Sequence, residues 1–175
     1  MGRARLGFKA PVEVGTFDVV ESLRGNATTD FGAPGAQPKA DDREVDAAEL
    51  RRLRALFQAC WRAFDDAVKG ARGRTLAKGP RGGGRPLLSV VKHVLEADSG
   101  YLSGLGWKYK LETTSPHGLE PLRAAMLDGL AASARGEIPR TGPRGGRRWK
   151  PRYFVRRSAW HVLDHAWEIE DRTRP

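Results

Sequence analysis

At 175 residues, 39% of them hydrophobic, the chain is long enough for one domain with a sizeable core. The sequence has no apolar run that would span a bilayer and no secretory signal after its basic start. Its single cysteine, Cys60, excludes a disulfide framework. We therefore expect a cytoplasmic protein without membrane contact. The formal net charge is +10, and it is concentrated in residues 70–85 and 137–157, which favours anionic partners.

Residues 1–43 are expected to form an irregular N-terminal extension that packs on the domain behind it. Residues 17–23 suit a short strand or an extended segment, and the stretch that follows is rich in turn formers. Phe17 and Phe31 are candidate anchors for this packing. A floppy arm without fixed contacts is the alternative.

A helical domain is expected over residues 44–175, because apolar residues recur there every three or four positions. The first helix is predicted from about residue 44 to 69. Asp41 or Asp42 is the candidate N-cap of this helix, and Gly70 is the candidate C-cap.

Three more helices follow in the same periodicity. The second is predicted over about residues 86–105. The third helix covers residues 116–135 or 119–135. The later start would place Pro121 in the first turn, which is where a helix tolerates proline. The fourth helix covers residues 151–172. This range contains no glycine, and its one proline, Pro151, stands at the first position, where a helix accepts it.

Two glycine-rich basic segments connect these helices, residues 70–85 and 136–150. Their glycines let backbone amides approach an anion, although the residue order of a phosphate-binding P-loop is absent. Solvated loops with no partner are the alternative to an anion site. Four arginines in them are candidates for holding an anionic part of a substrate: Arg81, Arg85, Arg147 and Arg148.

The last helix carries two histidines, His161 and His165, four positions apart and therefore on one face. At this spacing two neutral imidazoles can bind one transition-metal ion from a helix. Phe154, Arg157 and Glu168 share the face. Two histidines without a ligand role remain the alternative. A neighbouring apolar stripe is formed by Tyr153, Trp160, Leu163 and Trp167.

A third histidine, His93, lies in the middle of the second helix with small residues on its face: Ser89, Ala97 and Gly100. Small neighbours leave room for an ion and a bound ligand. If the second and fourth helices face each other, three imidazoles converge on one divalent ion and leave coordination positions open. Cys60 is expected to be a buried structural thiol, and His117 a solvated histidine.

The surroundings of these histidines resemble the DinB/YfiT-like superfamily. His93 in Val91–Asp98 and the two histidines in Trp160–Arg172 carry the resemblance, which covers roughly residues 44–172. It implies an all-α fold, a four-helix bundle of DinB-like type, with a divalent metal, often nickel or zinc, on the three histidines. Members include thiol-dependent S-transferases and a mycothiol-dependent isomerase. Residues 25–35 are also similar to a stretch found ahead of some DinB-like domains.

Glu168 has two possible roles beside the histidines. As a hydrogen-bond acceptor for a metal-binding imidazole, it would leave the ion open to substrate. As a fourth ligand, it would close the site and argue against catalysis. Asp164 and Glu96 are less well placed for either role.

The pattern as a whole predicts a protein that binds a divalent metal ion. We expect a thiol-dependent S-transferase, or a related metal-dependent hydrolase, acting on a small anionic substrate, with a low-molecular-weight thiol as partner. A non-catalytic binding or stress-response protein that contacts nucleic acid through its basic loops is the alternative, although no nucleic-acid motif is present. A homodimer is compatible with either function.

Overall fold

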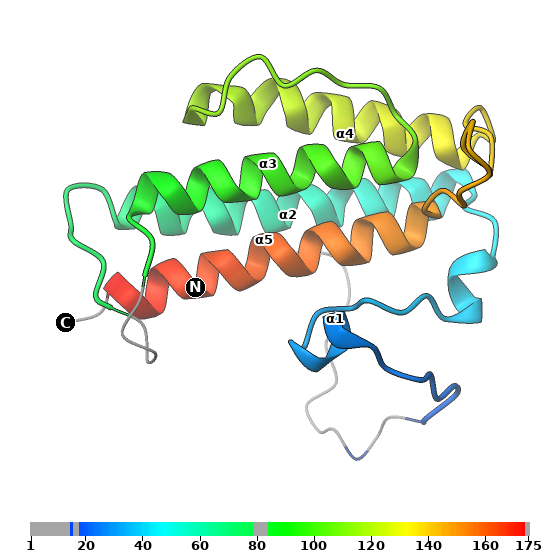
Figure 1. The fold of residues 1–175 in the computed structure, drawn as a ribbon, viewed down its shortest axis with the longest axis horizontal. Coiled ribbons are helices and arrows are strands. Elements are labelled where there is room, and N and C mark those ends of the chain that lie inside the picture. The colour runs from blue at the N-terminus through cyan, green and yellow to red at the C-terminus, as the bar shows by residue number, and fades with distance from the viewer. Residues whose placement is uncertain (1–14, 16–17, 79–83, 174–175) are drawn as a thin grey trace.

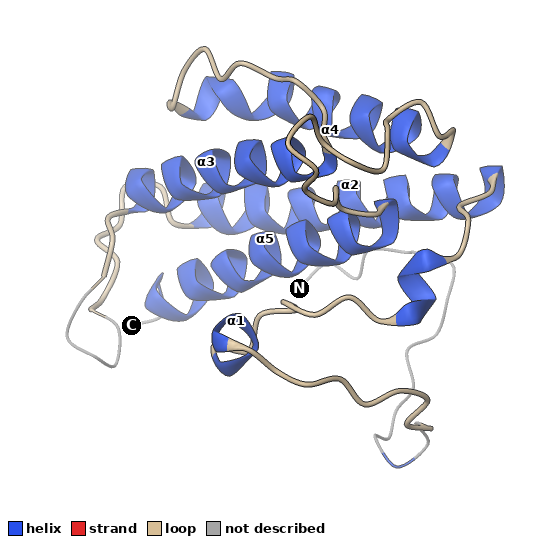
Figure 2. Ribbon diagram, turned by 45° about the vertical axis from the view of Figure 1, so that its right-hand side comes forward, coloured by secondary structure: helices blue, strands red, loops and turns tan. Residues whose placement is uncertain are grey.

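The computed structural model describes residues 15, 18–78 and 84–173, and within them the chain is helical without a strand (Figure 2). The all-α fold class is therefore confirmed. None of the helices in this described part combines the length and apolar composition needed to cross a membrane. The long helices are α2 (Ala47–Gly70), α3 (Leu87–Leu105), α4 (Leu119–Ala134) and α5 (Pro151–Thr173), and the short ones are α1 (Ala27–Asp30) and the 3-10 turns η2 (Lys39–Asp42) and η3 (Pro116–Gly118).

The four long helices lie side by side, as Figure 1 shows. Helix α5 packs against both α2 and α3, and α3 packs in turn against α4. The second and fourth predicted helices therefore face each other. This contact brings the helix of His93 to the helix of His161 and His165.

The core forms where the apolar faces of these helices meet. Phe57 of α2 is fully buried and stacks on Trp61, with ring centroids 5.0 Å apart. Phe154 of α5 meets the same Phe57 ring edge-on at 5.4 Å. This aromatic contact joins α2 to α5 and fixes the helix that carries two of the histidines.

Of the apolar stripe predicted on α5, Tyr153 is buried and Leu163 packs against the core. Trp160 and Leu163 are only partly buried, and Trp167 is 49% exposed. The buried residues of α5 are Tyr153, Phe154, Val155, Ser158, His161, Val162, His165, Ala166 and Ile169. The two tryptophans of α5 therefore lie at the edge of its buried face.

The predicted helix boundaries need two corrections. The N-cap of α2 is Asp46, whose side chain accepts a hydrogen bond from the Glu49 amide at 2.7 Å, and not Asp41 or Asp42. At the other end, Gly70 belongs to the helix. Both proposed starts of the third helix have a counterpart, because a 3-10 turn begins at Pro116 and α4 follows from Leu119.

An ion pair holds the N-terminal extension against α5. Asp41 is only 4% exposed and receives two hydrogen bonds from the Arg156 guanidinium, at 2.7 and 2.6 Å. The same guanidinium donates to the Ala36 carbonyl at 3.2 Å. Phe31 is 79% exposed, so the prediction that it anchors the extension is wrong. Phe17 lies outside the described residues, and residues 18–25 form no strand.

Asp41→Asn should loosen the extension, because Arg156 would lose its charged partner. A fully buried pair loses about 3–5 kcal/mol when one partner is removed, and the partial exposure of Arg156 reduces this to roughly 1–2 kcal/mol. We expect faster limited proteolysis between residues 18 and 40, read by mass spectrometry. The control is Asp42→Asn, which removes an exposed carboxylate paired with Lys150. Equal cleavage rates in both variants would contradict this role for Asp41.

Asp98 of α3 is a buried carboxyl that lacks a hydrogen bond at Oδ1 within the described residues. Burial raises its pKa to about 8, although the Arg123 charge opposes the rise. The folded protein therefore keeps a proton that the unfolded chain releases above its ordinary pKa of 3.8. Stability from this group is lost as the pH rises from about 4 towards 8.

Asp98→Asn should remove this loss of stability. The free energy of unfolding of the variant should exceed that of the unmodified protein by a margin that widens with pH, by at most about 1.4 kcal/mol per pH unit, and the melting temperature should rise accordingly. Thermal unfolding at pH 5 and pH 8, with chelator present throughout, measures the margin. Asp66→Asn, which changes an exposed carboxylate of α2, is the control. A margin that stays constant between the two pH values would show that Asp98 is ionised in the fold.

Candidate metal centre

Three imidazoles converge between α3 and α5. Nε2 of His161 lies 3.3 Å from Nε2 of His93 and 3.2 Å from Nε2 of His165. One nitrogen of each ring can be chosen so that all three atoms lie within 4.8 Å of one another. His161 and His165 are buried, and His93 is partly exposed. The three histidines are therefore close enough to hold one metal ion.

The spacing of these nitrogens fits a metal ion. Two imidazole nitrogens bound to one ion at about 2.0–2.1 Å with tetrahedral geometry lie roughly 3.3–3.4 Å apart. The two measured separations are close to this value. Lone pairs that point at one another at such distances repel unless a proton or a cation lies between them. A cation among the three rings would remove that repulsion, so the donor set fits a divalent metal.

Glu168 orients one of the rings. Its Oε2 lies 2.7 Å from Nδ1 of His165, so Nδ1 carries the proton that is donated to the carboxylate and Nε2 keeps its lone pair for the centre. Glu168 is not one of the three groups whose atoms converge. Of its two predicted roles, the geometry matches the hydrogen-bond acceptor and not the fourth ligand.

Arg172 fixes this carboxylate in turn. Its guanidinium donates to Glu168 Oε1 at 2.6 Å, and also to the carbonyls of Ala77 and Arg85, both at 2.8 Å. The Arg172 side chain is only 10% exposed. Burial alone would raise the pKa of Glu168, but the hydrogen bonds from His165 and Arg172 outweigh burial and lower it. The carboxylate is therefore charged and held from both sides.

The surroundings favour neutral imidazoles, which are the form that binds metal. Burial first, and then the neighbouring His165 and His93, lower the pKa of His161 to about 3. Burial also lowers the pKa of His93, with a contribution from the charge of Arg85. In addition, Nδ1 of His161 is buried without a hydrogen-bond partner in the described structure. The site therefore excludes extra protons and suits a metal cation bound through lone pairs.

Two of the small residues predicted on the face of His93 lie at the surface of α3. A Cβ placed on Gly100 of α3 would meet no atom within 4 Å, and Ser89 on the same face is exposed. The ring of Tyr101 stands edge-on to His161, with centroids 5.5 Å apart, and forms a neighbouring wall. Ser89 and Gly100 are therefore uncovered, and the prediction that they leave room for a ligand at the ion stays a prediction.

Only one of the four candidate arginines is placed near the histidines. The charge of Arg85 contributes, after burial, to lowering the pKa of His93. Arg81 lies outside the described residues. Arg147 and Arg148 belong to the loop between α4 and α5, where Arg148 donates to the Pro139 carbonyl at 3.1 Å.

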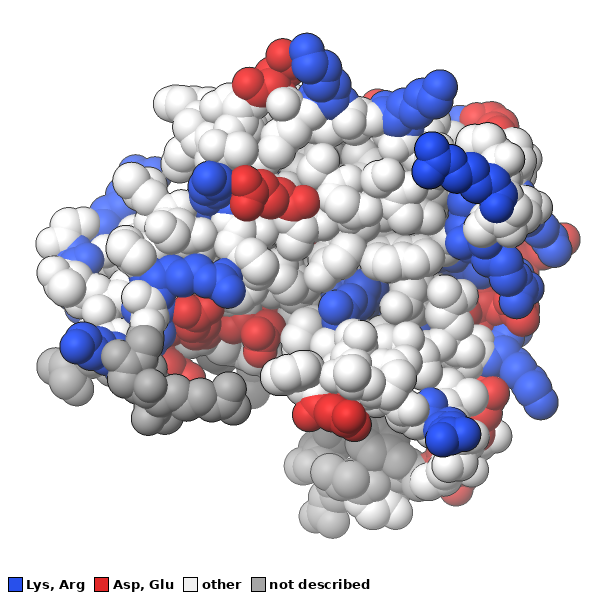
Figure 3. All heavy atoms as spheres, in the orientation of Figure 1, with Lys and Arg blue, Asp and Glu red and all other residues white. Residues whose placement is uncertain are grey.

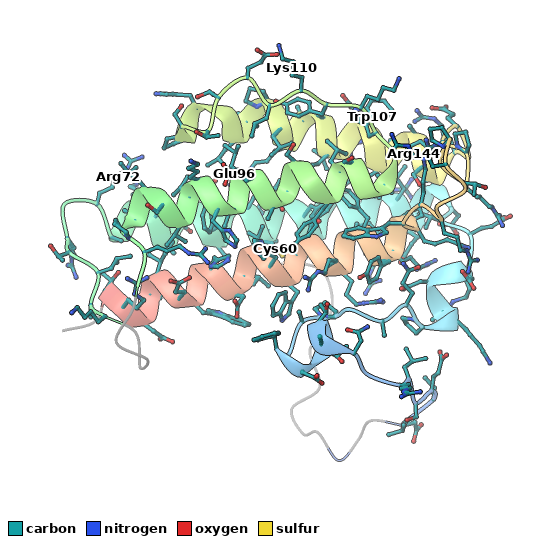
Figure 4. The ribbon with its side chains drawn as sticks, in the orientation of Figure 1. Cys60, Arg72, Glu96, Trp107, Lys110 and Arg144 are labelled. Atoms are coloured by element: carbon teal, nitrogen blue, oxygen red, sulfur yellow. The ribbon has the colours of Figure 1, made fainter. Side chains whose placement is uncertain are left out.

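The two basic segments lie at opposite ends of the molecule. Figure 4 shows Arg72 in the loop after α2 at one end and Arg144 in the loop after α4 at the other. Lys and Arg side chains gather most densely at the second end, with acidic side chains among them (Figure 3). The described parts of the two segments therefore do not merge into one basic surface, and contact with nucleic acid stays a prediction.

The remaining candidates do not belong to the group of converging side chains. Asp164 and Glu96 are exposed, and Glu96 pairs with Lys92 at 3.7 Å. His117 is exposed, as expected. Cys60 is buried, and burial raises the pKa of its thiol to about 11, which suits a structural thiol and not a nucleophile.

Two residues of the site were missed in the sequence, Arg172 and Tyr101. Arg172 lies four positions after Glu168, a spacing at which opposite charges pair on a helix, so it carried a usable signal. Helical spacing places Tyr101 at the edge of the face of His93, but its approach to His161 was not predictable because it depends on how α3 packs against α5.

Glu168→Gln should weaken metal binding without abolishing it. The variant keeps the size of the side chain but loses the charge that holds the His165 proton, and such losses cost about 10–100-fold in metal affinity. Competition with a chromophoric chelator measures the affinity. Glu112→Gln, which removes an exposed carboxylate paired with Lys110 in the loop after α3, is the control and should not change it. An unchanged affinity in Glu168→Gln would show that the carboxylate does not support the site.

The geometry of these side chains is the basis for any statement about function. A scan against protein-family models, a search of curated proteins and a search of solved structures each found no match to the chain.

Proposed function

We propose that this protein is a metal-dependent enzyme of the DinB-like kind, a four-helix bundle in which His93, His161 and His165 bind one divalent ion. The observation that carries the proposal is the convergence of three Nε2 atoms from two helices, two of whose separations are 3.2 and 3.3 Å. The carboxylate of Glu168 behind His165 supports it, because metal-binding histidines are commonly oriented in this way.

Zinc and nickel are the proposed ions. Three neutral imidazole nitrogens with no thiolate suit borderline metals, and no described cysteine or carboxylate joins the group. Three protein ligands leave at least one coordination position free, which is the pattern of catalytic and not of structural sites.

The proposed reaction is the transfer of a low-molecular-weight thiol to an electrophilic carbon, with hydrolysis as the related variant. When bound, a divalent ion supplies Lewis acidity, which favours the deprotonated form of a thiol or of water. The residues of the chain have separate tasks. The three imidazoles fix the position of the site, Glu168 and Arg172 keep His165 in the required tautomer, and Arg85 adds positive charge nearby.

A turnover assay tests the proposal. The purified protein is stripped with chelator, reloaded with Zn²⁺ or Ni²⁺, and incubated with glutathione, cysteine or N-acetylcysteine and an electrophile such as 1-chloro-2,4-dinitrobenzene. We expect conjugation that requires the metal and disappears in His161→Ala. Ester and amide substrates form a second panel for the hydrolytic variant. Metal binding with no turnover in either panel would contradict the enzymatic proposal while leaving the metal site intact.

A further inference from the structure

A hollow separates the N-terminal extension from α5, beside the part of the helix that precedes His161. It has a volume of ≈ 360 Å³, which is in the range of small-molecule sites, about 300–1,000 Å³. Segments far apart in the sequence form its walls, since α1 lies beside α5 (Figure 1). Its lining consists of Ala27, Thr28, Phe31, Ala33, Arg157 and Trp160.

Arg157 differs from the other arginines of α5 that face the extension and α2. Arg152 is paired with Glu49, and Arg156 with Asp41. Arg157 has no acidic partner within the described residues, and its NH1 atom is buried without a hydrogen-bond partner there. A buried donor without a partner is unfavourable, and more so when the group is charged. Because Arg157 also lines the hollow, its guanidinium can take a carboxylate or phosphate there, and both match the fork of a guanidinium.

The other walls are apolar and partly aromatic. Phe31 is 79% exposed although it lines the hollow, and Trp160 is partly buried. The guanidinium of Arg157 lies over the Trp160 ring at 5.3 Å and over the Tyr101 ring at 5.5 Å. Ala27 and Ala33 leave room between these walls. The lining therefore complements a flat apolar body with one anionic group.

We infer that this hollow binds a small organic anion, whose carboxylate or phosphate is held by Arg157 and whose flat apolar part lies against Phe31 and Trp160. This site is distinct from the metal centre but adjacent to it. Trp160 directly precedes His161, and Tyr101 contacts both the guanidinium of Arg157 and the ring of His161. If the proposed function holds, the anion belongs to the electrophilic substrate. Binding in the hollow does not itself require the metal.

Isothermal titration of the full chain with three probes tests the inference. The probes are 2-naphthoate, 2-naphthyl phosphate and the uncharged 2-naphthamide. We expect at least one anion to bind ten times more tightly than the amide, and the better of the two identifies the preferred group. Chelator treatment should leave these affinities unchanged, so failure of the enzyme proposal remains distinguishable from failure of this one.

Two variants and a matched control assign the binding to the hollow. Arg157→Gln should weaken binding of the anions at least tenfold and change binding of the amide little. Ala27→Trp, which keeps the charge but fills the hollow from α1, should abolish binding of all three probes. Arg144→Gln removes the same charge from the distant loop after α4 and should change nothing. Circular dichroism establishes that each variant is folded.

Three outcomes would overturn the inference. The first is equal affinity for the anions and the amide. The second is an equal loss in Arg144→Gln and Arg157→Gln, which would indicate attraction to net charge alone. The third is no probe binding together with a dimer in light scattering that Ala27→Trp dissociates, because the hollow would then be an interface between two copies of the chain.

Discussion

His161→Ala is expected to abolish metal binding. The untreated protein should hold about one equivalent of Zn²⁺ or Ni²⁺ per chain after desalting, and the variant close to none. His161 is the ring whose Nε2 lies near both of the others, at 3.3 and 3.2 Å, so its loss separates the two remaining ligands. The loss of affinity should exceed the 10–100-fold expected for Glu168→Gln, since a direct ligand is removed.

Two measurements make this result specific. His117→Ala removes an exposed histidine from η3 and should retain the full equivalent of metal. In thermal unfolding, added Zn²⁺ should raise the melting temperature of the unmodified protein and of His117→Ala, because an ion that binds only the folded state stabilises it. It should not raise that of His161→Ala. Retention of one equivalent by His161→Ala would place the metal elsewhere.

Phe57→Ala is expected to cause the largest loss of stability. The ring is fully buried and contacts Trp61 in its own helix and Phe154 in α5. Truncating such a residue costs about 3–5 kcal/mol, which for a chain of this size lowers the melting temperature by roughly 2–4 °C per kcal/mol. Urea unfolding followed by circular dichroism measures the free energy.

Phe31→Ala is the matched control for Phe57→Ala. The same change in a ring that is 79% exposed should alter the free energy of unfolding by no more than about 0.5 kcal/mol. Below its melting temperature, Phe57→Ala should still bind one metal equivalent, because the histidines themselves are unchanged. A loss below about 1 kcal/mol in Phe57→Ala would mean that the contact between α2 and α5 tolerates a cavity at this position.

The helices were predictable because their signals are local. Apolar residues every three or four positions mark α2 and α3, and prolines mark the starts of η3 and α5. The convergence of His93 with His161 and His165 was predicted from the four-residue spacing of the last two and from an assumed contact between the second and fourth helices. Helical spacing puts two of the rings on one face, and the packing of α3 on α5 supplies the third.

The errors arose where contacts between distant segments decide the outcome. Asp41 has the residue type and position of a helix cap, but its carboxylate accepts a hydrogen bond from Arg156, 115 positions later. Asp46 caps α2 instead. Trp167 is a large apolar residue of the predicted stripe, yet it is 49% exposed, and the buried face of α5 runs through Ser158 and Ala166 instead. Hydrophobicity along one helix does not show which row its neighbours contact.

X-ray absorption spectroscopy of the full chain loaded with one equivalent of Zn²⁺ tests the metal centre most directly. The account predicts a first shell of nitrogen and oxygen at about 2.0–2.1 Å, with the multiple-scattering pattern of three imidazoles, reduced to two in His93→Ala. A shell containing sulfur, or an imidazole pattern unchanged in His93→Ala, would contradict it.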